Sequence, residues 1–376
     1  MNSLPAVATA IALTGLQGMT PARLRLLLRR NEPGTALAVV RGEHSDPVLT
    51  EHLRTRGRRD ERPTDWFARW RAELERCGVA ERYDAFLASG MGVVCWGEPG
   101  YPECLLDDPD APSVLFHRGD LSILDARRVG IVGTRSATAG GLRLATDLGR
   151  ELAGHGIRVV SGLARGIDGA AHRGALAGQA GRPVAVVASG LDVVYPREHR
   201  ALWEQVATEG LLLGERPPGA SPQAMSFPER NRILAGLCEI VVVVESRSSG
   251  GSLITAREAL RRDLTVMAVP GSLSSRASEG TNELLRDGLA TMLLDTTDVL
   301  VALGLDTRRA SGRRFDPRPP AAPDEQHLLD LIGADAVTID ELVLRSGLPL
   351  TDVAVCLGRL ESAGRVERSG GWFVRR

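Results

Sequence analysis

Apolar residues in the central part of the chain come in short continuous runs, separated by longer segments with helical spacing. Such runs, rich in Val, Ile and Leu, are typical of parallel strands that are buried on both faces. The pattern predicts strands at 129–133, 158–161, 184–188, 211–215, 240–245, 265–269 and 291–294. Because strands and helices alternate, residues 127–305 are predicted to form an α/β domain with a doubly wound (Rossmann-like) parallel sheet. Ligands of such sheets bind beyond the carboxyl ends of the strands.

The N-terminal part, residues 1–90, has helical spacing throughout. Two apolar-periodic segments flank a Gly-x-x-Thr-Pro turn, with Thr20 placed as the N-cap and Pro21 at the first helical position. The turn is similar to a helix-hairpin-helix in a SAM-like domain, which can present backbone amides to DNA. A small helical packing domain explains the pattern equally well. Residues 91–126, dense in Pro and Gly, are predicted to form an irregular lead-in to the central domain.

The C-terminal part consists of a predicted linker, residues 306–323, and a predicted winged helix, residues 324–376. Three short helical segments precede a hairpin that turns at Gly370-Gly371. From Asp324 onward nine side chains are acidic and six are basic, and the third helix carries Asp352 and Glu361 against a single Arg359. Since DNA phosphates attract positive charge, we interpret this module as a protein-contact or packing unit.

Composition narrows the possible chemistry. The chain of 376 residues has a formal net charge of −1, and all of its basic residues other than histidine are arginine. A P-loop lysine and a Schiff-base lysine are therefore excluded. The five cysteines are scattered and form no CxxC pair, which predicts reduced thiols in the cytoplasm and no metal site. No apolar run has the length of a membrane span, so we expect no membrane association.

Two glycine-rich turns follow predicted strands. In the first, Gly133 allows close backbone approach, Thr134 and Ser136 offer hydroxyls, and Arg135 offers a guanidinium for phosphate. The turn is not a GxGxxG fingerprint, which disfavours NAD.

The second turn contains Gly162, Arg165 and Gly166 and ends at Asp168. An acid at a helix start is more often a cap than a catalytic base. His172, one turn further along the helix, would share a face with Asp168.

A third region combines arginines with a glycine-serine loop. Phe227 is placed to stack on a base or to join the core, and Arg230, Asn231 and Arg232 follow it. Arg230 and Arg232 lie about 200° apart around a helix. We therefore favour Arg230 for the ligand and expect one of the two to hold the fold together, with Arg232 kept among the candidate DNA-binding residues. The amides of the glycine-serine loop complete a predicted anion site, together with Arg247: Ser249, Gly250, Gly251 and Ser252.

Catalytic groups are in short supply. The sequence has no GxSxG elbow, no HExxH and no cluster with metal-ligand spacing. We expect no catalytic residue, no cofactor and no metal.

Seven motifs in order give the chain a resemblance to the DNA-processing protein A family (DprA/Smf). They are IVGTR, SGLARGIDGAAH, ASGLDVVYPREHRAL, FPERNRILAGL, VVVESRSSGGSLITA, AVPGS and EGTNELLRDG, and they span the central domain. The resemblance implies a cytoplasmic homodimer that binds and protects single-stranded DNA. It also implies that the protein helps load RecA recombinase onto that strand during natural transformation, without catalysis. Lysines that hold DNA in some relatives have no counterpart here.

Two further expectations accompany the resemblance. The far edge of the sheet, 291–294, and the helix carrying Leu284 and Leu285 are a candidate dimer surface. The rival hypothesis is a nucleotide N-glycosidase of the LOG-type phosphoribohydrolase class, whose Gly-Gly-x-Gly-Thr-x-x-Glu turn is partly matched by Gly250-Gly251 and Thr255 to Glu258. A winged-helix transcription regulator is a third hypothesis, disfavoured by the acidic third helix.

Overall fold

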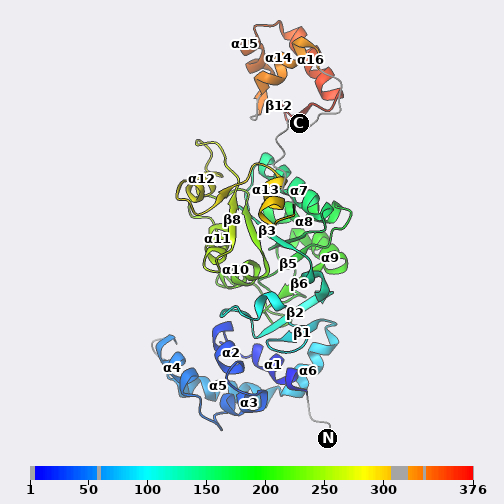
Figure 1. Ribbon diagram of the computed structural model, residues 1–376. Coiled ribbons are helices and arrows are strands. Elements are labelled where there is room, and N and C mark those ends of the chain that lie inside the picture. Colours follow the sequence, from blue (N-terminus) through cyan, green and yellow to red (C-terminus); the bar gives the residue numbers. More distant parts are fainter. Residues whose placement is uncertain (1–4, 57–60, 306–320, 333–335, 376) are drawn as a thin grey trace. The chain divides into compact units, whose positions relative to one another are not determined.

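The computed structural model describes residues 5–56, 61–305, 321–332 and 336–375. The chain forms two compact units, Met1–Arg309 and Ala310–Arg376 (Figure 1). Most of the predicted linker, residues 306–320, lies outside the described residues.

A nine-stranded sheet forms the centre of the first unit. Its order is β1-β2-β6-β5-β4-β3-β7-β8-β9, and strands β3 to β9 pair in parallel with one another. The strands are β1 Gly92–Cys95, β2 Val114–Gly119, β3 Arg128–Val132, β4 Arg158–Ser161, β5 Val184–Val186, β6 Leu211–Gly214, β7 Ile240–Val243, β8 Thr265–Ala268 and β9 Thr291–Met292. The predicted doubly wound α/β fold is confirmed.

The sequence pattern predicted that residues 91–126 are irregular, and the structure shows that this prediction is wrong. They contain β1 and β2, which pair antiparallel with each other and extend the sheet beyond β6. Their apolar runs, residues 93–95 and 114–116, have only three residues each, and a Pro- and Gly-rich segment separates them. Their pairing is stabilised by long-range contacts, which a local pattern does not record.

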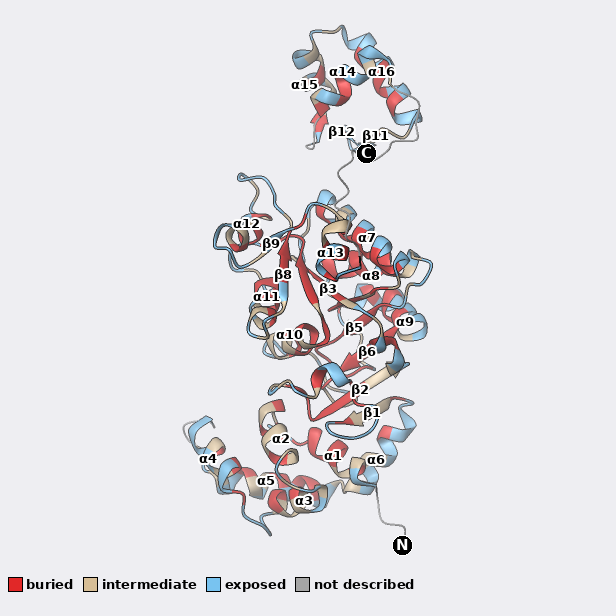
Figure 2. Cartoon of the chain, viewed as in Figure 1, coloured by how far each residue is buried: buried red, intermediate tan, exposed pale blue. Residues whose placement is uncertain are grey.

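Helices cover both faces of the sheet (Figure 1). One core cluster joins the strands to α7 Ala139–Gly154, α8 Ile167–Ala177 and α13 Thr296–Ala302. A second cluster joins the other face to α10 Ser226–Leu237, α11 Ser252–Leu260 and α12 Glu279–Arg286. A further helix, α9 Arg200–Glu209, packs against β2 and β6. Figure 2 shows the strands buried between half-exposed helices, as expected for a parallel sheet.

The dimer surface predicted at Leu284 and Leu285 is corrected by this packing. Leu284 is only 7% exposed and belongs to the core cluster, and Leu285 is partly buried against the same cluster. Side chains already packed inside one chain offer little area to a partner. The exposed apolar residues near this edge are Leu289, Met292 and Leu294.

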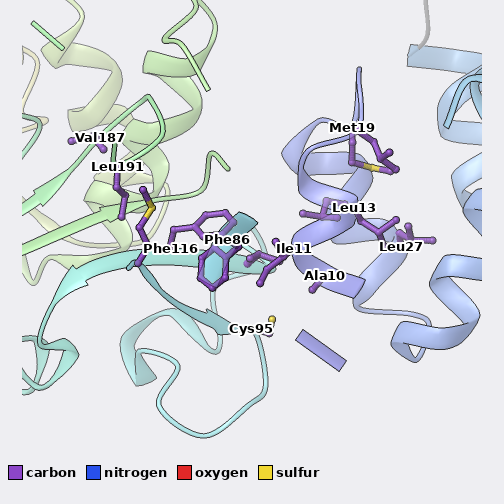
Figure 3. Packing of buried hydrophobic residues seen from close by; sticks show 14 of the residues in the cluster. Ala10, Ile11, Leu13, Met19, Leu27, Phe86, Cys95, Phe116, Val187 and Leu191 are labelled. Carbon is purple, nitrogen blue, oxygen red and sulfur yellow. The ribbon is translucent and has the colours of Figure 1, made fainter. Parts of the chain in front are cut away.

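The N-terminal helices share a core with the sheet. They are α1 Ala6–Thr14, α2 Pro21–Leu28, α3 Pro33–Arg41, α4 Pro47–Arg56, α5 Pro63–Arg76 and α6 Val79–Ala88. Figure 3 shows Phe86 beside Phe116 of β2, with ring centroids 5.8 Å apart, and Ile11 of α1 next to them. This shared core explains why the helices and the sheet form one compact unit.

The Gly-x-x-Thr-Pro turn forms as predicted, with Thr20 accepting a hydrogen bond from the Arg23 amide. However, the turn faces the protein. The Gln17 amide donates to the Glu73 carboxylate at 3.1 Å, and a side chain at Gly18 would overlap Trp66. The local geometry therefore favours the packing interpretation over contact with a DNA backbone.

The second unit is a winged helix. It contains α14 Pro323–Ile332, α15 Ile339–Ser346 and α16 Leu350–Ser362, and a three-stranded sheet of β10 Val337–Thr338, β11 Val366–Ser369 and β12 Trp372–Arg375. Its own apolar cluster holds these elements together. The β11–β12 turn lies at Gly370-Gly371, where both φ angles are positive.

Candidate functional site

A cavity of about 660 Å³ lies at the carboxyl ends of β3 and β7. We call it the Arg135 pocket. Four segments line it: the loop after β3, the loop from β4 into the start of α8, the first turns of α10, and the loop from β7 into α11. It brings together most of the predicted site residues: Gly133, Thr134, Arg135, Ser136, Phe227, Arg230, Asn231, Ser249, Gly250, Gly251 and Ser252. Gly162, Arg165, Gly166 and Arg232 lie outside its lining.

The loop after β3 is held tightly at its base. The Thr134 amide donates to the Glu245 carbonyl oxygen at 2.8 Å, which ties the loop to the end of β7. A Cβ at Gly133 would come within 2.9 Å of the same oxygen and overlap Ile167, so only glycine fits there. The Glu245 carboxylate also accepts a hydrogen bond from the Thr138 amide at the start of α7. These contacts fix the position from which Arg135 projects.

Arg135 is exposed and stacks on an aromatic ring. Its guanidinium carbon lies 4.8 Å from the centroid of the half-buried Phe227 ring, which in turn lies 5.5 Å from the ring of Tyr195. Phe227 is therefore neither purely core nor purely solvent-facing. Stacking of this kind holds a guanidinium at the pocket wall while its N–H groups stay available to an anion.

Arg230 lines the pocket from below and is buried, with 7% exposure. It donates to the carbonyl oxygens of Gly162, at 2.8 Å, and of Val186. Burial lowers the pKa of Arg230 to about 10, so the guanidinium stays charged at neutral pH. Arg230 thus contributes positive charge to the floor of the pocket while it fixes the loop after β4.

Asp168 faces the same loop from the other side. Its carboxylate accepts a hydrogen bond from the Gly162 amide at 3.2 Å. Burial raises the pKa of Asp168, and the neighbouring Arg230 opposes that rise. The sequence suggested that Asp168 caps its own helix, but α8 has no side-chain hydrogen bond at its N-cap. The carboxylate instead holds the loop between β4 and α8 in place. Local sequence cannot distinguish these roles, because Gly162 and Asp168 meet only when the loop folds back.

Arg232 and Arg165 point to other partners. Arg232 forms an ion pair with Glu215 and donates to the Asp110 carbonyl oxygen, so it holds α10 against the end of β6. Arg230 and Arg232 therefore have different partners, as their spacing predicted, but Arg232, a candidate DNA-binding residue, is held by Glu215 and Asp110 and does not line the pocket. Arg165 is exposed and lies 3.4 Å from the Glu198 carboxylate.

The glycine-serine loop supplies backbone and charge on the opposite wall. Ser252 donates its hydroxyl to Ser246 Oγ at 2.8 Å, and the Gly250 amide donates to the Arg247 carbonyl oxygen at 2.9 Å. The Arg247 side chain is exposed and forms no ion pair with any residue in the described ranges. Three arginines thus line the cavity, against the single buried carboxylate of Asp168.

One residue of this site was not expected from the sequence. Tyr195 lies in the quoted motif ASGLDVVYPREHRAL, but nothing in the spacing indicated that it would meet Phe227. In the described part of the chain, no group of three or more His, Cys, Asp or Glu residues is arranged to hold a metal ion. None of the described helices has the length and apolarity needed to cross a membrane.

Two family models match the chain. Residues 92–304 match the model described as DNA recombination-mediator protein A, and residues 314–371 match the DprA winged helix domain. The first match alone covers the whole sheet and all four segments that line the Arg135 pocket.

Curated relatives give the same result. The chain is 41% identical to the DNA processing protein DprA of Bacillus subtilis over 205 residues, which cover 54% of this chain and 69% of the relative. It is 33% identical to the protein Smf of Synechocystis over 314 residues, 74% of this chain and 78% of the relative.

Solved structures agree as well. The chain is similar to the DNA processing protein A of Streptococcus pneumoniae, with a TM-score of 0.65 and 30% identity, over 80% of this chain and 98% of that one. It is also similar to DNA processing protein A from Helicobacter pylori, with a TM-score of 0.52 and 30% identity, over 57% and 95%. That structure concerns the single-stranded DNA binding mode of the Helicobacter protein. The chain therefore belongs to the DNA recombination-mediator protein A family, the DprA/Smf proteins.

Proposed function

We propose that this protein binds single-stranded DNA in the Arg135 pocket. The observation that carries the proposal is the lining of that pocket, in which three arginines and a glycine-serine loop meet at the carboxyl edge of the sheet. The single-stranded DNA binding mode of the similar Helicobacter protein supports it. Exposed arginines and hydroxyls are the groups that contact phosphates in sequence-independent binding.

Different residues of the pocket would contact different parts of the strand. Arg135 and Arg247, both exposed, contact successive phosphates, while buried Arg230 raises the positive potential beneath them. Phe227 and Tyr195 offer ring surface to one or two bases. Stacking favours a single strand, because bases in a duplex are already stacked on one another. This arrangement tolerates any sequence, as protection of incoming strands requires.

The proposed role is non-catalytic. The N-glycosidase hypothesis needs an acidic group at the reacting sugar, and in the partly matched turn that group is Glu258. Glu258 instead pairs with Arg261 and Arg262 and does not line the pocket. The remaining acid, Asp168, is occupied by the Gly162 amide. The relatives are named as DNA processing proteins, which also favours strand handling over base release.

Strand protection and loading of RecA recombinase during natural transformation complete the proposal, in a cytoplasmic homodimer. The exposed apolar residues at the β9 edge support such a dimer, since Met292 is 49% exposed and Leu294 73%. A partner that covers this edge would also cover the unpaired side of β9. Two Arg135 pockets in one assembly would hold one strand by two attachments and raise its residence time.

Fluorescence anisotropy tests whether the protein binds single-stranded DNA. The titration uses a labelled strand of about 30 nucleotides and its duplex, each at two salt concentrations. Preferential binding of the single strand, weakened by salt, is the expected result. Binding of neither, with release of base from AMP or CMP, would overturn the proposal in favour of the enzyme. RecA loading is tested by the rate of RecA filament assembly on a strand already covered by a single-strand-binding protein. An unchanged rate in the presence of this protein would remove RecA loading from the proposal.

A further inference from the structure

The connection from β1 to β2 contains an acidic loop, Asp-Asp-Pro-Asp, at residues 107–110. We call it the Asp110 loop. None of its residues lines the Arg135 pocket, and the side chain of Asp108 is only 8% exposed. A buried carboxylate requires a positive partner or several hydrogen bonds, because an unpaired charge inside a protein is unfavourable. The partners of this loop therefore show which elements it holds together.

The partners of the Asp110 loop are arginines from three separate helices. Two come from α2 or the residue after it, one comes from α10, and two come from the residues that directly follow α11. The five are Arg25, Arg29, Arg232, Arg261 and Arg262. Helix α2 belongs to the N-terminal helices, whereas α10 and α11 cover the sheet. The loop therefore joins the N-terminal helices to the helices of the α/β part.

Asp110 alone contacts all three helices. Its Oδ1 accepts a hydrogen bond from Arg25 of α2 at 3.0 Å, and its Oδ2 pairs with Arg261 at the end of α11 at 3.3 Å. Its carbonyl oxygen accepts from Arg25 at 3.3 Å and from Arg232 of α10. Because each carboxylate oxygen serves a different helix, both oxygens are needed to keep the three helices together.

Two of these three helices form the Arg135 pocket. Helix α10 supplies Phe227, Arg230 and Asn231 to its lining, and the first turn of α11 supplies Ser252 and Thr255. The two helices pack against each other (Figure 1). Since Arg232 directly follows Asn231, its contact with Asp110 fixes the rotation of the turn that carries the pocket residues.

The charges around Asp110 make its carboxylate hard to replace. Burial and the nearby Arg232 guanidinium both lower the pKa of Arg25, whereas the Asp110 carboxylate opposes this shift. The guanidiniums of α2 and α10 thus repel each other across the loop, and Asp110 offsets the repulsion. Loss of its charge would leave partly buried cations facing each other, which favours movement of α10 away from α2.

We propose that Asp110 is a positioning residue of the strand site. It holds α10 and α11 against α2 at the separation and rotation that the Arg135 pocket requires, so the N-terminal helices contribute to strand binding without touching the strand. This inference rests on the proposed function. The effect of Asp110 reaches the pocket through Arg232 and Arg261, because Asp110 itself lies outside the lining.

The direction of the change in Kd for Asp110→Asn tests this proposal. Asparagine has the same shape and keeps the carbonyl contacts, but it has one side-chain acceptor oxygen, so either Arg25 or Arg261 loses its partner. Removal of an acidic charge by itself attracts phosphate and lowers Kd. A positioning role instead predicts that Kd for a single strand rises about threefold to tenfold, as for residues of one ion-pair network.

Asp107→Asn is the matched control. Asp107 is exposed, lies in the same loop and forms no ion pair with another described residue, and the variant has the same change of charge. Anisotropy titration at about 150 mM salt, where exposed charges more than about 8 Å apart are largely screened, compares the two variants with the parent. Asp107→Asn should leave Kd within twofold of the parent.

Hydrogen exchange of the full chain without DNA gives an independent measurement. Amides of residues 226–232 should exchange faster in Asp110→Asn than in the parent or in Asp107→Asn, because the first turns of α10 are held less firmly. Arg25→Gln removes one partner and leaves Asp110 paired with Arg261, so it provides the same measurement if Asp110→Asn does not fold. In the double variant, Arg25→Gln should weaken strand binding no further than Asp110→Asn alone.

Three results would overturn the proposal. The first is a Kd for Asp110→Asn within twofold of the parent or below it, and the second is unchanged exchange at residues 226–232. The third is a double variant whose loss equals the product of the two single losses, which would remove the link to α2. A parent protein that binds no strand would refute the proposed function, and the exchange measurement would still decide whether Asp110 positions α10.

Discussion

Replacement of Arg135 by alanine is the sharpest test of the strand site. The side chain is exposed, stacks on Phe227 at 4.8 Å and forms no ion pair with another residue in the described ranges, so its removal leaves no buried charge behind. One charge-assisted phosphate contact contributes about 1.5–3 kcal/mol, and solvent exposure places Arg135 near the lower value. We therefore expect Kd for a single strand to rise about tenfold, with the melting temperature unchanged.

Salt dependence identifies the lost contact as a phosphate. Each phosphate neutralised on a single strand adds about 0.7 to the slope of log affinity against log salt, so between about 50 and 200 mM salt the variant should lose about 2.6-fold less affinity than the parent. Anisotropy titration at both salt concentrations measures this. Arg150→Ala, an exposed arginine near the end of α7 that pairs with Asp147, is the matched control. A Kd within twofold of the parent would place the strand elsewhere, and an equal loss in the control would refute the reasoning from the pocket.

Three further outcomes follow from the packing around the pocket. Burial lowers the pKa of His172 to about 3, so the folded state disfavours its protonation and stability falls as pH drops below the unfolded value of about 6.5. The loss amounts to about 2 kcal/mol between pH 8 and pH 5, and denaturant unfolding of His172→Leu should lack this component. A methyl group at Gly162 would overlap the buried Arg230 guanidinium, so Gly162→Ala should lower the free energy of unfolding by about 1–3 kcal/mol. An unchanged melting temperature would contradict the tight contact between Gly162 and Arg230. Leu294→Glu places charge on the exposed β9 edge and should shift the protein to monomer in sedimentation velocity, whereas a monomeric parent would dismiss the proposed dimer.

The central sheet could be predicted because its information is local. Each of the seven strands expected from apolar runs occurs, and no end differs from the expected one by more than two residues. The separation of Arg230 from Arg232 was also predictable, because helical geometry alone turns residues two apart to different sides. The structure places Arg230 beneath the pocket and pairs Arg232 with Glu215.

Other parts of the site depend on contacts between distant segments. Asp168 meets Gly162 only after the loop folds back, and Tyr195 meets Phe227 across 32 positions of sequence. The apolar runs of β1 and β2 have only three residues each and flank a Pro- and Gly-rich segment, so their pattern is too brief to detect. Leu284 was assigned to the surface because an amphipathic pattern shows that a helix has an apolar face but not what covers it.

By itself the sequence determined the alternation of strands and helices, the glycine-rich turns at their ends and the surplus of arginine over catalytic groups. These follow from backbone geometry and residue chemistry within a few positions, which no distant contact alters. Only the tertiary structure decided which arginines are free to contact a ligand and which bind carboxylates or carbonyl oxygens of the protein itself. Those outcomes depend on which side chains from remote segments lie close together in the folded chain. The order of residues along the chain does not show this.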